Sequence, residues 1–257
     1  MSGSRRVPEG PAPDPAVQKV RVRYAKRGRM RFTSSRDFQR ALERAVRRAG
    51  LPMAYSGGFH PHPKISYANA APTGVASEAE YVELGLTEVV DPDEIAPRLH
   101  AGLPEGLDVV EVVDVTAVPG ALADRLQGSV WALRFRAGDA APEVLAAVPA
   151  AVEALLAREE VLVERMMKKG LRQLDVRAAL LDLAVASGPV EAVEVHPGDV
   201  VLVAGVLHTT PTIRPEEIWG ALREVSGQDL PRPVSTRLRQ GPVVDAGVAP
   251  TLSDTPV

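Results

Sequence analysis

Between residues 18 and 116, the spacing of the apolar residues switches between the period of a strand and the period of a helix. The order in which these segments follow one another limits the possible folds more than any other feature of the sequence. The segment KVRVRYAK alternates apolar and basic residues, which is typical of a strand with one buried face. A helix is predicted in TSSRDFQRALERAVRRAG, where apolar residues recur at helical spacing: Phe38, Leu42, Ala45 and Ala49. A strand, a strand, a helix and a strand follow in KISYANA, AEYVELGLT, DPDEIAPRLHAGLP and LDVVEVVDV. We therefore predict an α+β fold that begins with a ferredoxin-like β-α-β-β-α-β unit.

The first predicted helix has recognisable ends. Ser34 or Ser35 is a suitable N-cap, and Gly50 is a suitable residue just past the C-terminus. The second helix has Asp91 as its N-cap and Pro92 at its first position.

A second, looser α+β half of similar order is expected over residues 130–226. It contains a strand in SVWALRFRAG, a helix that Pro149 kinks or splits, and a strand in EVLVERM. A hairpin is predicted in VEAVEVHPGDVVLVAGVLHTT, with its turn at His196–Asp199, and RPEEIWGALREVSG is helical. The full predicted division is a disordered arm (1–17), a ferredoxin-like basic domain (18–116), a connection (117–129), the second half (130–226) and a disordered tail (227–257).

The composition excludes several kinds of site. The chain has no cysteine, so disulfides, cysteine-ligated clusters and cysteine nucleophiles are all excluded. No phosphate-binding loop, dinucleotide fingerprint or nucleophile elbow is present, and no cofactor is predicted. No apolar run reaches the ~20 residues that a membrane helix needs, and the N-terminus lacks the apolar stretch of a signal peptide. We expect a cytoplasmic protein without a membrane partner.

Charge is divided unevenly along the chain, although the net charge is only −3. Residues 19–64 contain thirteen Lys or Arg and two acids, whereas residues 65–125 contain twelve acids opposed by Arg98 and Arg125. A basic segment in a mildly acidic chain favours a local anionic partner, most commonly nucleic acid. The alternative is that the two segments neutralise each other within one fold.

The first predicted helix carries four arginines opposite its apolar stripe: Arg36, Arg40, Arg44 and Arg47. Like charges one turn apart repel by roughly a few tenths of a kcal/mol per pair, so folding alone gives no reason for the row. Arginine forks match phosphate oxygens, which favours an anionic ligand. The alternative is a solvated face paired with acids of residues 78–94.

Further cations extend this predicted surface. The strand and loop before the helix contribute Arg21, Arg23, Lys26, Arg27, Arg29 and Arg31, and a second cluster follows in RMMKKGLRQLDVR. The residues predicted to bind nucleic acid are Arg27, Arg29, Arg31, Arg36, Arg40, Arg44, Arg47, Lys64, Lys168, Lys169 and Arg172.

The segment YSGGFHPHPKISYA holds two histidines one residue apart, His60 and His62. On an extended chain both rings can face one side, as a metal pair requires, but no third ligand is obvious nearby in the sequence, so no metal is predicted. A general acid–base role for His62 is a second interpretation. The third is a rigid recognition loop, because glycines permit unusual backbone angles and prolines reduce the ordering cost on binding. The residues predicted to contact bases or a partner are Gly57, Gly58, Phe59, His60 and His62.

Three motifs between residues 20 and 84 resemble a known family: RFTSSRD at the helix start, RAGLPMAYSGGFHPHPKIS and GVASEAEY. They are similar to an uncharacterised radical SAM-linked bacterial family, a domain of unknown function. The resemblance extends over residues 18–226. It implies a protein that stands alone, or as a C-terminal extension, in association with cobalamin-binding radical SAM proteins.

The resemblance carries over no catalytic residue, because the family's activity is not established. Two positions depart from its pattern: many members have Ser-His-Leu-Asp where this chain has Ser34 to Asp37, and Asn-Pro-His-Pro where it has His60 to Pro63. A metal pair of His60 and His62 is therefore not general to the family. Without cysteine the chain cannot itself hold the radical SAM cluster, so it would be the partner.

Charge, motifs and resemblance together predict an accessory protein of a radical SAM enzyme. It would bind structured RNA, either tRNA or rRNA, through the basic helix and the Gly/His/Pro loop. Two alternatives stay open: an RNA-processing or RNA-modifying enzyme that uses His62, and a protein–protein interaction module without RNA.

Overall fold

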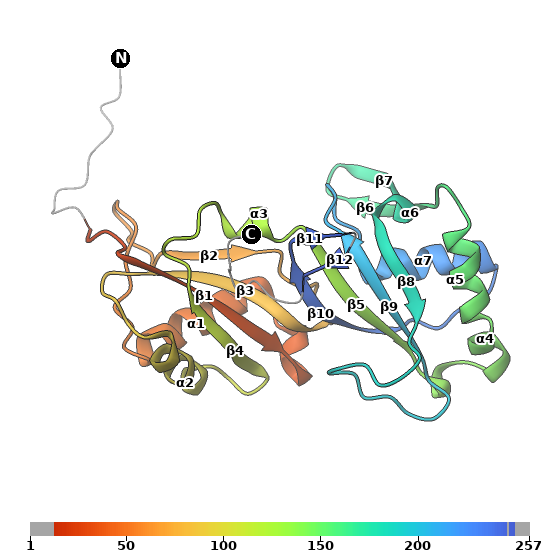
Figure 1. The fold of residues 1–257 in the computed structure, drawn as a ribbon, viewed down its shortest axis with the longest axis horizontal. Helices are drawn as coiled ribbons and strands as arrows, with labels where there is room; N and C mark the ends of the chain where they lie inside the picture. The colour runs from red at the N-terminus through yellow and green to blue at the C-terminus, as the bar shows by residue number, and fades with distance from the viewer. Residues whose placement is uncertain (1–12, 246, 250–257) are drawn as a thin grey trace, which may run out of the picture. The chain divides into compact units, whose positions relative to one another are not determined.

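The chain folds into two compact units, seen in a computed structural model that describes residues 13–245 and 247–249 (Figure 1). The first unit contains the described residues up to 73 together with 80–123, and the second contains 74–79 and the described residues from 124 onward. Both combine helices and strands, so the predicted α+β class is confirmed. Among the described residues, no helix is both long and apolar enough to span a lipid bilayer.

The predicted tails fall only partly within this range. Positions 1–12 of the expected arm lie outside the described residues, and residues 13–17 precede the first strand. The backbone N–H of Val17 donates to the carbonyl oxygen of Leu86 at 2.8 Å, which attaches the end of this segment to the first unit.

In the first unit, the strands β4 and β2 each pair antiparallel with a neighbouring strand of the sheet. Strand β4 pairs antiparallel with β1, β2 pairs antiparallel with β3, and β1 lies between β4 and β3. The ferredoxin-like assignment of this unit stays a prediction. Its elements are β1 (Gln18–Lys26), the 3-10 helix η1 (Gly28–Phe32), α1 (Ser35–Arg48), β2 (Ile65–Ala68), β3 (Ala76–Leu86), α2 (Pro92–Gly102) and β4 (Leu107–Asp114).

Helix α1 begins and ends where its sequence predicts. Ser34 is the N-cap, and its Oγ accepts a hydrogen bond of 3.2 Å from the backbone N–H of Asp37. Gly50 follows the helix with φ of +59°, a left-handed value that favours glycine. The guanidinium of Arg98 donates to the carbonyl oxygen of Ala49 at 2.5 and 3.0 Å, satisfying a group that the helix end leaves open. Both ends of the helix are thereby fixed.

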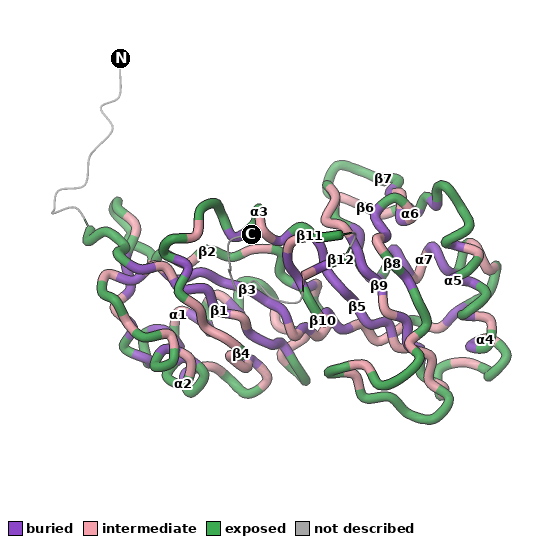
Figure 2. Tube along the Cα trace, viewed as in Figure 1, coloured by how far each residue is buried: buried purple, intermediate pink, exposed green. Residues whose placement is uncertain are grey.

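One side of α1 packs into the core of the first unit. Phe38 stacks on Tyr24 with ring centroids 4.6 Å apart. Gly102 of α2 lies so close to Ala45 that a Cβ at position 102 would come within 3.0 Å of its backbone, so glycine permits the close approach of the two helices. Figure 2 shows the buried stretches of β1 and β3 that belong to this core. The fully or largely buried core residues include Val20, Val22, Leu42, Val46, Val82, Leu84, Leu86, Ile95, Leu99 and Leu107.

An arginine and a glutamate are buried together in the first unit. Arg21 on β1 is 2% exposed and Glu83 on β3 is 5% exposed. Two N–H groups of Arg21 donate to Oε1 of Glu83, at 2.7 and 3.1 Å. The prediction that Arg21 belongs to an exposed basic surface is therefore wrong. Neighbouring residues of β1 are buried on both of its faces, so the alternation of the strand does not mark a solvent face.

Removing the Glu83 carboxylate is expected to destabilise the protein strongly. The substitution Glu83→Leu leaves the Arg21 charge buried without this partner and should lower the free energy of unfolding by about 3–5 kcal/mol. Combining it with Arg21→Met should recover most of the loss, because no buried charge then remains there. Urea denaturation measures both effects. The exposed Glu88→Leu is the control, and an equal loss in the two single variants would contradict the importance of the buried pair.

The second unit contains an antiparallel sheet with the strand order β10-β5-β9-β8. The first residues of β3 also belong here, and Ala76 and Ser77 pair in parallel with β10. Strands β6 and β7 form a separate hairpin (Figure 1). The elements are β5 (Gly128–Phe135), η2 (Ala137–Asp139), α4 (Pro142–Ala146), α5 (Val148–Leu156), β6 (Leu162–Met167), β7 (Gly170–Asp175), α6 (Val176–Ala179), β8 (Leu180–Val185), β9 (Val200–Leu207), α7 (Pro215–Ser226), β10 (Val234–Gly241), β11 (Val243–Val244) and β12 (Gly247–Val248).

The structure bears on two further sequence predictions, the break of a helix at Pro149 and the connection over residues 117–129. The helix containing Pro149 is split into α4 and α5, as the proline suggested. The predicted connection, residues 117–129, contains the short helix α3 (Leu122–Arg125), and β5 begins inside it at Gly128.

The predicted hairpin turning at His196–Asp199 is wrong. Strand β9 pairs instead with β8, and residues 186–199 form the connection between them. Leu183 of β8 is only 2% exposed, whereas Val195 in the segment predicted to pair is 44% exposed. Burial against the rest of the unit therefore decided the pairing, rather than the local alternation of residues.

The predicted disordered tail, residues 227–257, is also wrong over the length of β10. This strand pairs antiparallel with β5, from Val234 opposite Arg134 to Gly241 opposite Gly128. Gln240 is fully buried, and its side-chain amide donates to the carbonyl oxygen of Ala79 at 2.9 Å. Polar and proline-rich composition suggested disorder, but pairing on both edges provides stabilisation that composition does not reveal.

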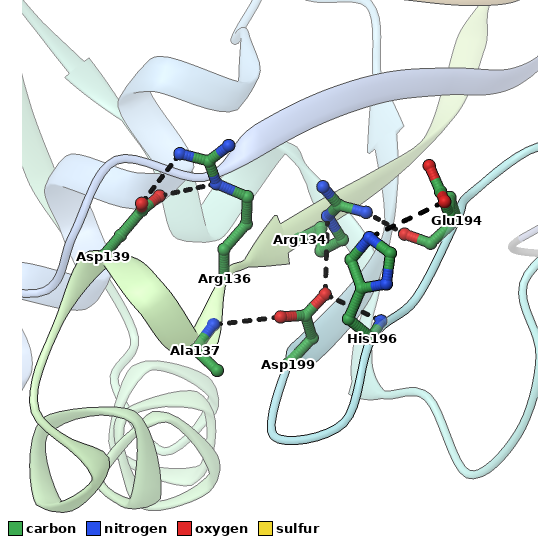
Figure 3. A network of polar contacts seen from close by, with 7 residues as sticks. All are labelled: Arg134, Arg136, Ala137, Asp139, Glu194, His196 and Asp199. Atoms are coloured by element: carbon green, nitrogen blue, oxygen red, sulfur yellow. Dashed lines mark hydrogen bonds and ion pairs between the residues drawn. The ribbon is translucent and has the colours of Figure 1, made fainter.

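The connection between β8 and β9 is closed by a network of polar contacts around Asp199 (Figure 3). The Asp199 carboxylate accepts hydrogen bonds from the backbone N–H groups of Ala137 at 2.9 Å and His196 at 3.0 Å. Arg134 lies 3.7 Å from the same carboxylate and also donates to the carbonyl oxygen of Glu194. Burial alone would raise the pKa of Asp199, but these hydrogen bonds and the charge of Arg134 outweigh it and hold the pKa below its ordinary value.

The stability that Asp199 contributes is expected to be lost in acid. Its pKa is lowered on folding, so the contribution is complete above the unfolded pKa of about 3.9 and disappears as pH falls through the folded value. Asp199→Asn should therefore lower the melting temperature at neutral pH, and its difference from the unmodified chain should shrink below about pH 4. Thermal melts over a pH series measure this. The exposed Asp182→Asn is the control, and a difference for Asp199→Asn that persists unchanged into acid would contradict the assignment.

Candidate nucleic-acid interface

Four exposed arginines line the solvent side of α1 and form the surface that we call the arginine face: Arg36, Arg40, Arg44 and Arg47. Arg40 lies 3.8 Å from Asp37, but both side chains are more than half exposed (59% and 62%), so this pair neutralises little. None of the four forms another ion pair with a described acid. The alternative that residues 78–94 neutralise this face therefore has no ion pair to support it within the described chain.

Arg27 and the 3-10 helix η1, which precede α1, add cations and an exposed ring. Arg27 and Arg29 are exposed, and Arg27 pairs with Asp108 at 3.0 Å. The half-buried Arg31 places its guanidinium 4.7 Å from the centre of the Phe32 ring, and Phe32 is 59% exposed. Sequence reasoning missed Phe32 as a contact residue, although an aromatic flanked by cations in GRMRF is a usable signal. A ring in this position can stack on a nucleobase.

Two cations predicted for this surface lie elsewhere. Lys26 is 6% exposed, and its ammonium group donates to the carbonyl oxygen of Ala71 at 3.2 Å. Arg23 is half-buried on β1 and lies 3.5 Å from Glu111. Arg23 follows from the same cause as the misplaced Arg21, since β1 is covered on both faces, whereas Lys26 is the last residue of β1 rather than part of the loop.

The predicted recognition loop is closed at its base by backbone contacts. Tyr55 and Pro63 form a β-bridge. The Ser56 N–H donates to the carbonyl oxygen of His62 at 2.8 Å, and the His62 N–H donates to Ser56 Oγ at 3.0 Å. Gly58 has φ of +113°, which favours glycine. The predicted contact residues are all exposed on this loop: Gly57, Gly58, Phe59, His60 and His62.

Phe59 is the most exposed aromatic residue of the loop, at 63%. Lys64 lies at the base of the loop with its side chain exposed, while its backbone N–H donates to the carbonyl oxygen of Ala54 at 2.7 Å. Tyr67 on β2 meets Phe38 edge-on at 6.2 Å and is more buried, so it belongs to the margin of the core. Burial and, to a smaller extent, the charge of Glu43 raise the pKa of the Tyr67 hydroxyl.

The two loop histidines are exposed, and within residues 13–245 and 247–249 neither belongs to a group of candidate metal ligands. In the described part of the chain, no group of three or more His, Cys, Asp or Glu is placed to hold a metal ion. No described side chain hydrogen-bonds to the ring of His62, whereas a catalytic histidine is usually oriented by a second group.

The second predicted cluster lies on the β6–β7 hairpin of the second unit. Lys168 and Lys169 occupy its turn and Arg172 lies on β7, all exposed. Arg165 has a different role, since it pairs with Glu217 of α7 at 3.2 Å.

The fold and these surfaces define an α+β protein that presents a solvent-exposed row of arginines and, on neighbouring segments of the chain, exposed aromatic rings. The chain belongs to a family of uncharacterised proteins conserved in bacteria, DUF2344, whose model matches residues 19–215. The resemblance inferred from the three motifs is confirmed to this extent. No curated protein matches the chain.

Proposed function

We propose that this protein binds structured RNA through the arginine face and acts as an accessory to a radical SAM enzyme. The arginine face carries the first part of the proposal. The helix rises 1.5 Å per residue, so Arg36 and Arg47 are separated by about 16 Å along α1. A row of that length can meet several phosphates of one strand.

The contacts that fix α1 in the fold do not involve the arginine face. The ends of α1 are fixed by Ser34 and Arg98, and its packing depends on the opposite side. Repulsion between arginines one turn apart opposes helix formation by roughly a few tenths of a kcal/mol per pair. An anionic ligand converts this repulsion into favourable contacts, because arginine donates in a fork that matches phosphate oxygens.

Exposed rings favour RNA with unpaired bases over a purely phosphate-based contact. Phe32 lies next to Arg31, and Phe59 extends from a loop whose base is closed by Ser56 and His62. Stacking on such rings contributes about 1–3 kcal/mol per base and tolerates sequence changes. Loops and bulges of tRNA or rRNA offer bases of this kind.

The radical SAM partner rests on the family resemblance together with the composition. The chain has no cysteine to ligate the required cluster, so chemistry of that kind must belong to the partner. In this arrangement the protein holds the RNA while the enzyme acts on it.

Reversing two charges on the arginine face is expected to weaken RNA binding. Arg40→Glu with Arg44→Glu should lower affinity for unfractionated tRNA or rRNA by about tenfold or more, since charge-assisted contacts are lost. The plot of log affinity against log salt should become shallower by about 1.4–1.8, the contribution of two phosphates. Gel-shift titrations over a salt series measure both quantities.

The control for this variant has the same change in net charge. Arg158→Glu with Arg239→Glu alters two exposed arginines of the second unit that lie outside every predicted contact set. An equal loss of RNA affinity in the two double variants would show a general effect of net charge and would contradict a specific role of α1. A chain that binds no RNA even at low salt would favour the interaction module without RNA.

A substitution at His62 distinguishes the accessory protein from the alternative of an RNA-modifying or RNA-processing enzyme. In the proposed role, His62→Ala should keep RNA affinity within about threefold, because the backbone of His62, rather than its ring, closes the loop. Incubation with bound RNA, followed by sequencing and mass analysis, checks for turnover. An RNA product that the unmodified chain forms alone and His62→Ala does not would favour the enzyme instead.

A further inference from the structure

The β6–β7 hairpin combines two surface features that folding does not require. Met166 is 73% exposed and Leu171 is 54% exposed, and the two residues are directly opposite each other across the strands. The adjoining turn consists of Lys168 and Lys169 and is completed by Gly170 with φ of +111°. An apolar pair thus lies next to a cationic tip.

The base of the hairpin is firmly held while the tip is exposed. Val163 and Leu174 face each other and are 9% and 6% exposed. Arg165 pairs with Glu217 of α7 at 3.2 Å and donates to the carbonyl oxygen of Thr212 at 3.1 Å. The tip is therefore presented on a preorganised support, which lowers the cost of ordering it on binding.

The cations of the tip have no acidic partner within the described chain. Lys168, Lys169 and Arg172 form no ion pair with a described acid. Arg172 is also directly opposite Arg165, and like charges in that position destabilise a strand pair. Asn, Asp and Gly are the usual turn residues of such hairpins, so two lysines are not explained by turn geometry.

We propose that the hairpin tip is a second RNA-contact element, which places Met166 and Leu171 in the minor groove of an A-form RNA helix and the turn residues Lys168 and Lys169 on its phosphates. This inference rests on the proposed function and specifies base-paired RNA as the ligand of the second unit. The minor groove of A-form RNA is wide and shallow, and it exposes riboses and base edges that an apolar pair can contact. The charges on the tip are complementary to the phosphates on both sides of that groove.

The two parts of the tip should differ in their dependence on salt. Met166→Ser with Leu171→Ser should weaken binding to an RNA duplex of about 20 base pairs by roughly five- to twentyfold without changing the salt slope, because apolar contacts release no counterions. Lys168→Ala with Lys169→Ala should weaken binding and reduce the slope by about 1.4–1.8. Both effects should be smaller on one separated strand of the same duplex.

Two controls make this experiment decisive. Val89→Ser with Val110→Ser removes two exposed apolar side chains of the first unit, 78% and 41% exposed, and should leave duplex affinity unchanged. Thermal melts should show that the hairpin variants remain folded, and the lysine variant tests the tip without touching its apolar residues.

The outcomes distinguish this inference from the proposed function. If the hairpin variants bind the duplex normally while the arginine-face variant is weakened, the hairpin proposal is overturned and the proposed function stands. If the unmodified chain binds no RNA, both fail. If the hairpin variants instead lose binding to phosphatidylserine vesicles and keep RNA affinity, the tip is a membrane contact and the RNA assignment is wrong.

Discussion

The packing of α1 into the core of the first unit determines how the rest of that surface is arranged. Phe38 against Tyr24, and Ala45 against Gly102, fix the rotation of the helix about its axis. With this rotation of the helix, the four arginine side chains of the arginine face point into solvent. The orientation of the arginine face is thus a consequence of core packing, and a change in the core would alter the direction in which each of its arginines points.

A buried and an exposed use of arginine occur within one unit. Arg21 is enclosed with Glu83, where losing the partner is costly, and it carries no accessible charge. The arginines of α1 keep their charges in water with almost no partners. The same residue type therefore contributes to fold stability in β1 and to an external electrostatic field on α1.

The sequence predicted local features well where the signal was carried by neighbouring residues. The Ser34 cap, the Gly50 stop and the break at Pro149 were all correct, because each depends on backbone chemistry within one turn. Pairings between distant segments were predicted poorly. Strand β9 pairs with β8 rather than with the adjoining segment, across a connection that local alternation does not identify. The composition of residues 227–257 predicts a disordered tail, but β10 forms there because its partners β5 and Ala76–Ser77 are far away in the sequence.

The candidate surface was predicted in part for the same reason. The helical period identified which arginines share a face, and these four are exposed. Alternation on β1 gave Arg21 and Arg23 the wrong environment, because a single strand does not reveal that its second face is covered. Phe32, Met166 and Leu171 were not selected, since the exposure of an apolar side chain becomes visible only when the surrounding chain is folded.

The central position of β10 has a consequence for the order in which the second unit can form. Its partners Ala76 and Ser77 and the strand β5 are synthesised long before it, yet β10 pairs with both of them. During translation these edges stay without their neighbour until the segment around residue 241 has left the ribosome, so the sheet is completed late. The nascent chain consequently carries unpaired strand edges for much of its synthesis, a period in which chaperone binding or early docking of a partner would have the greatest effect on yield.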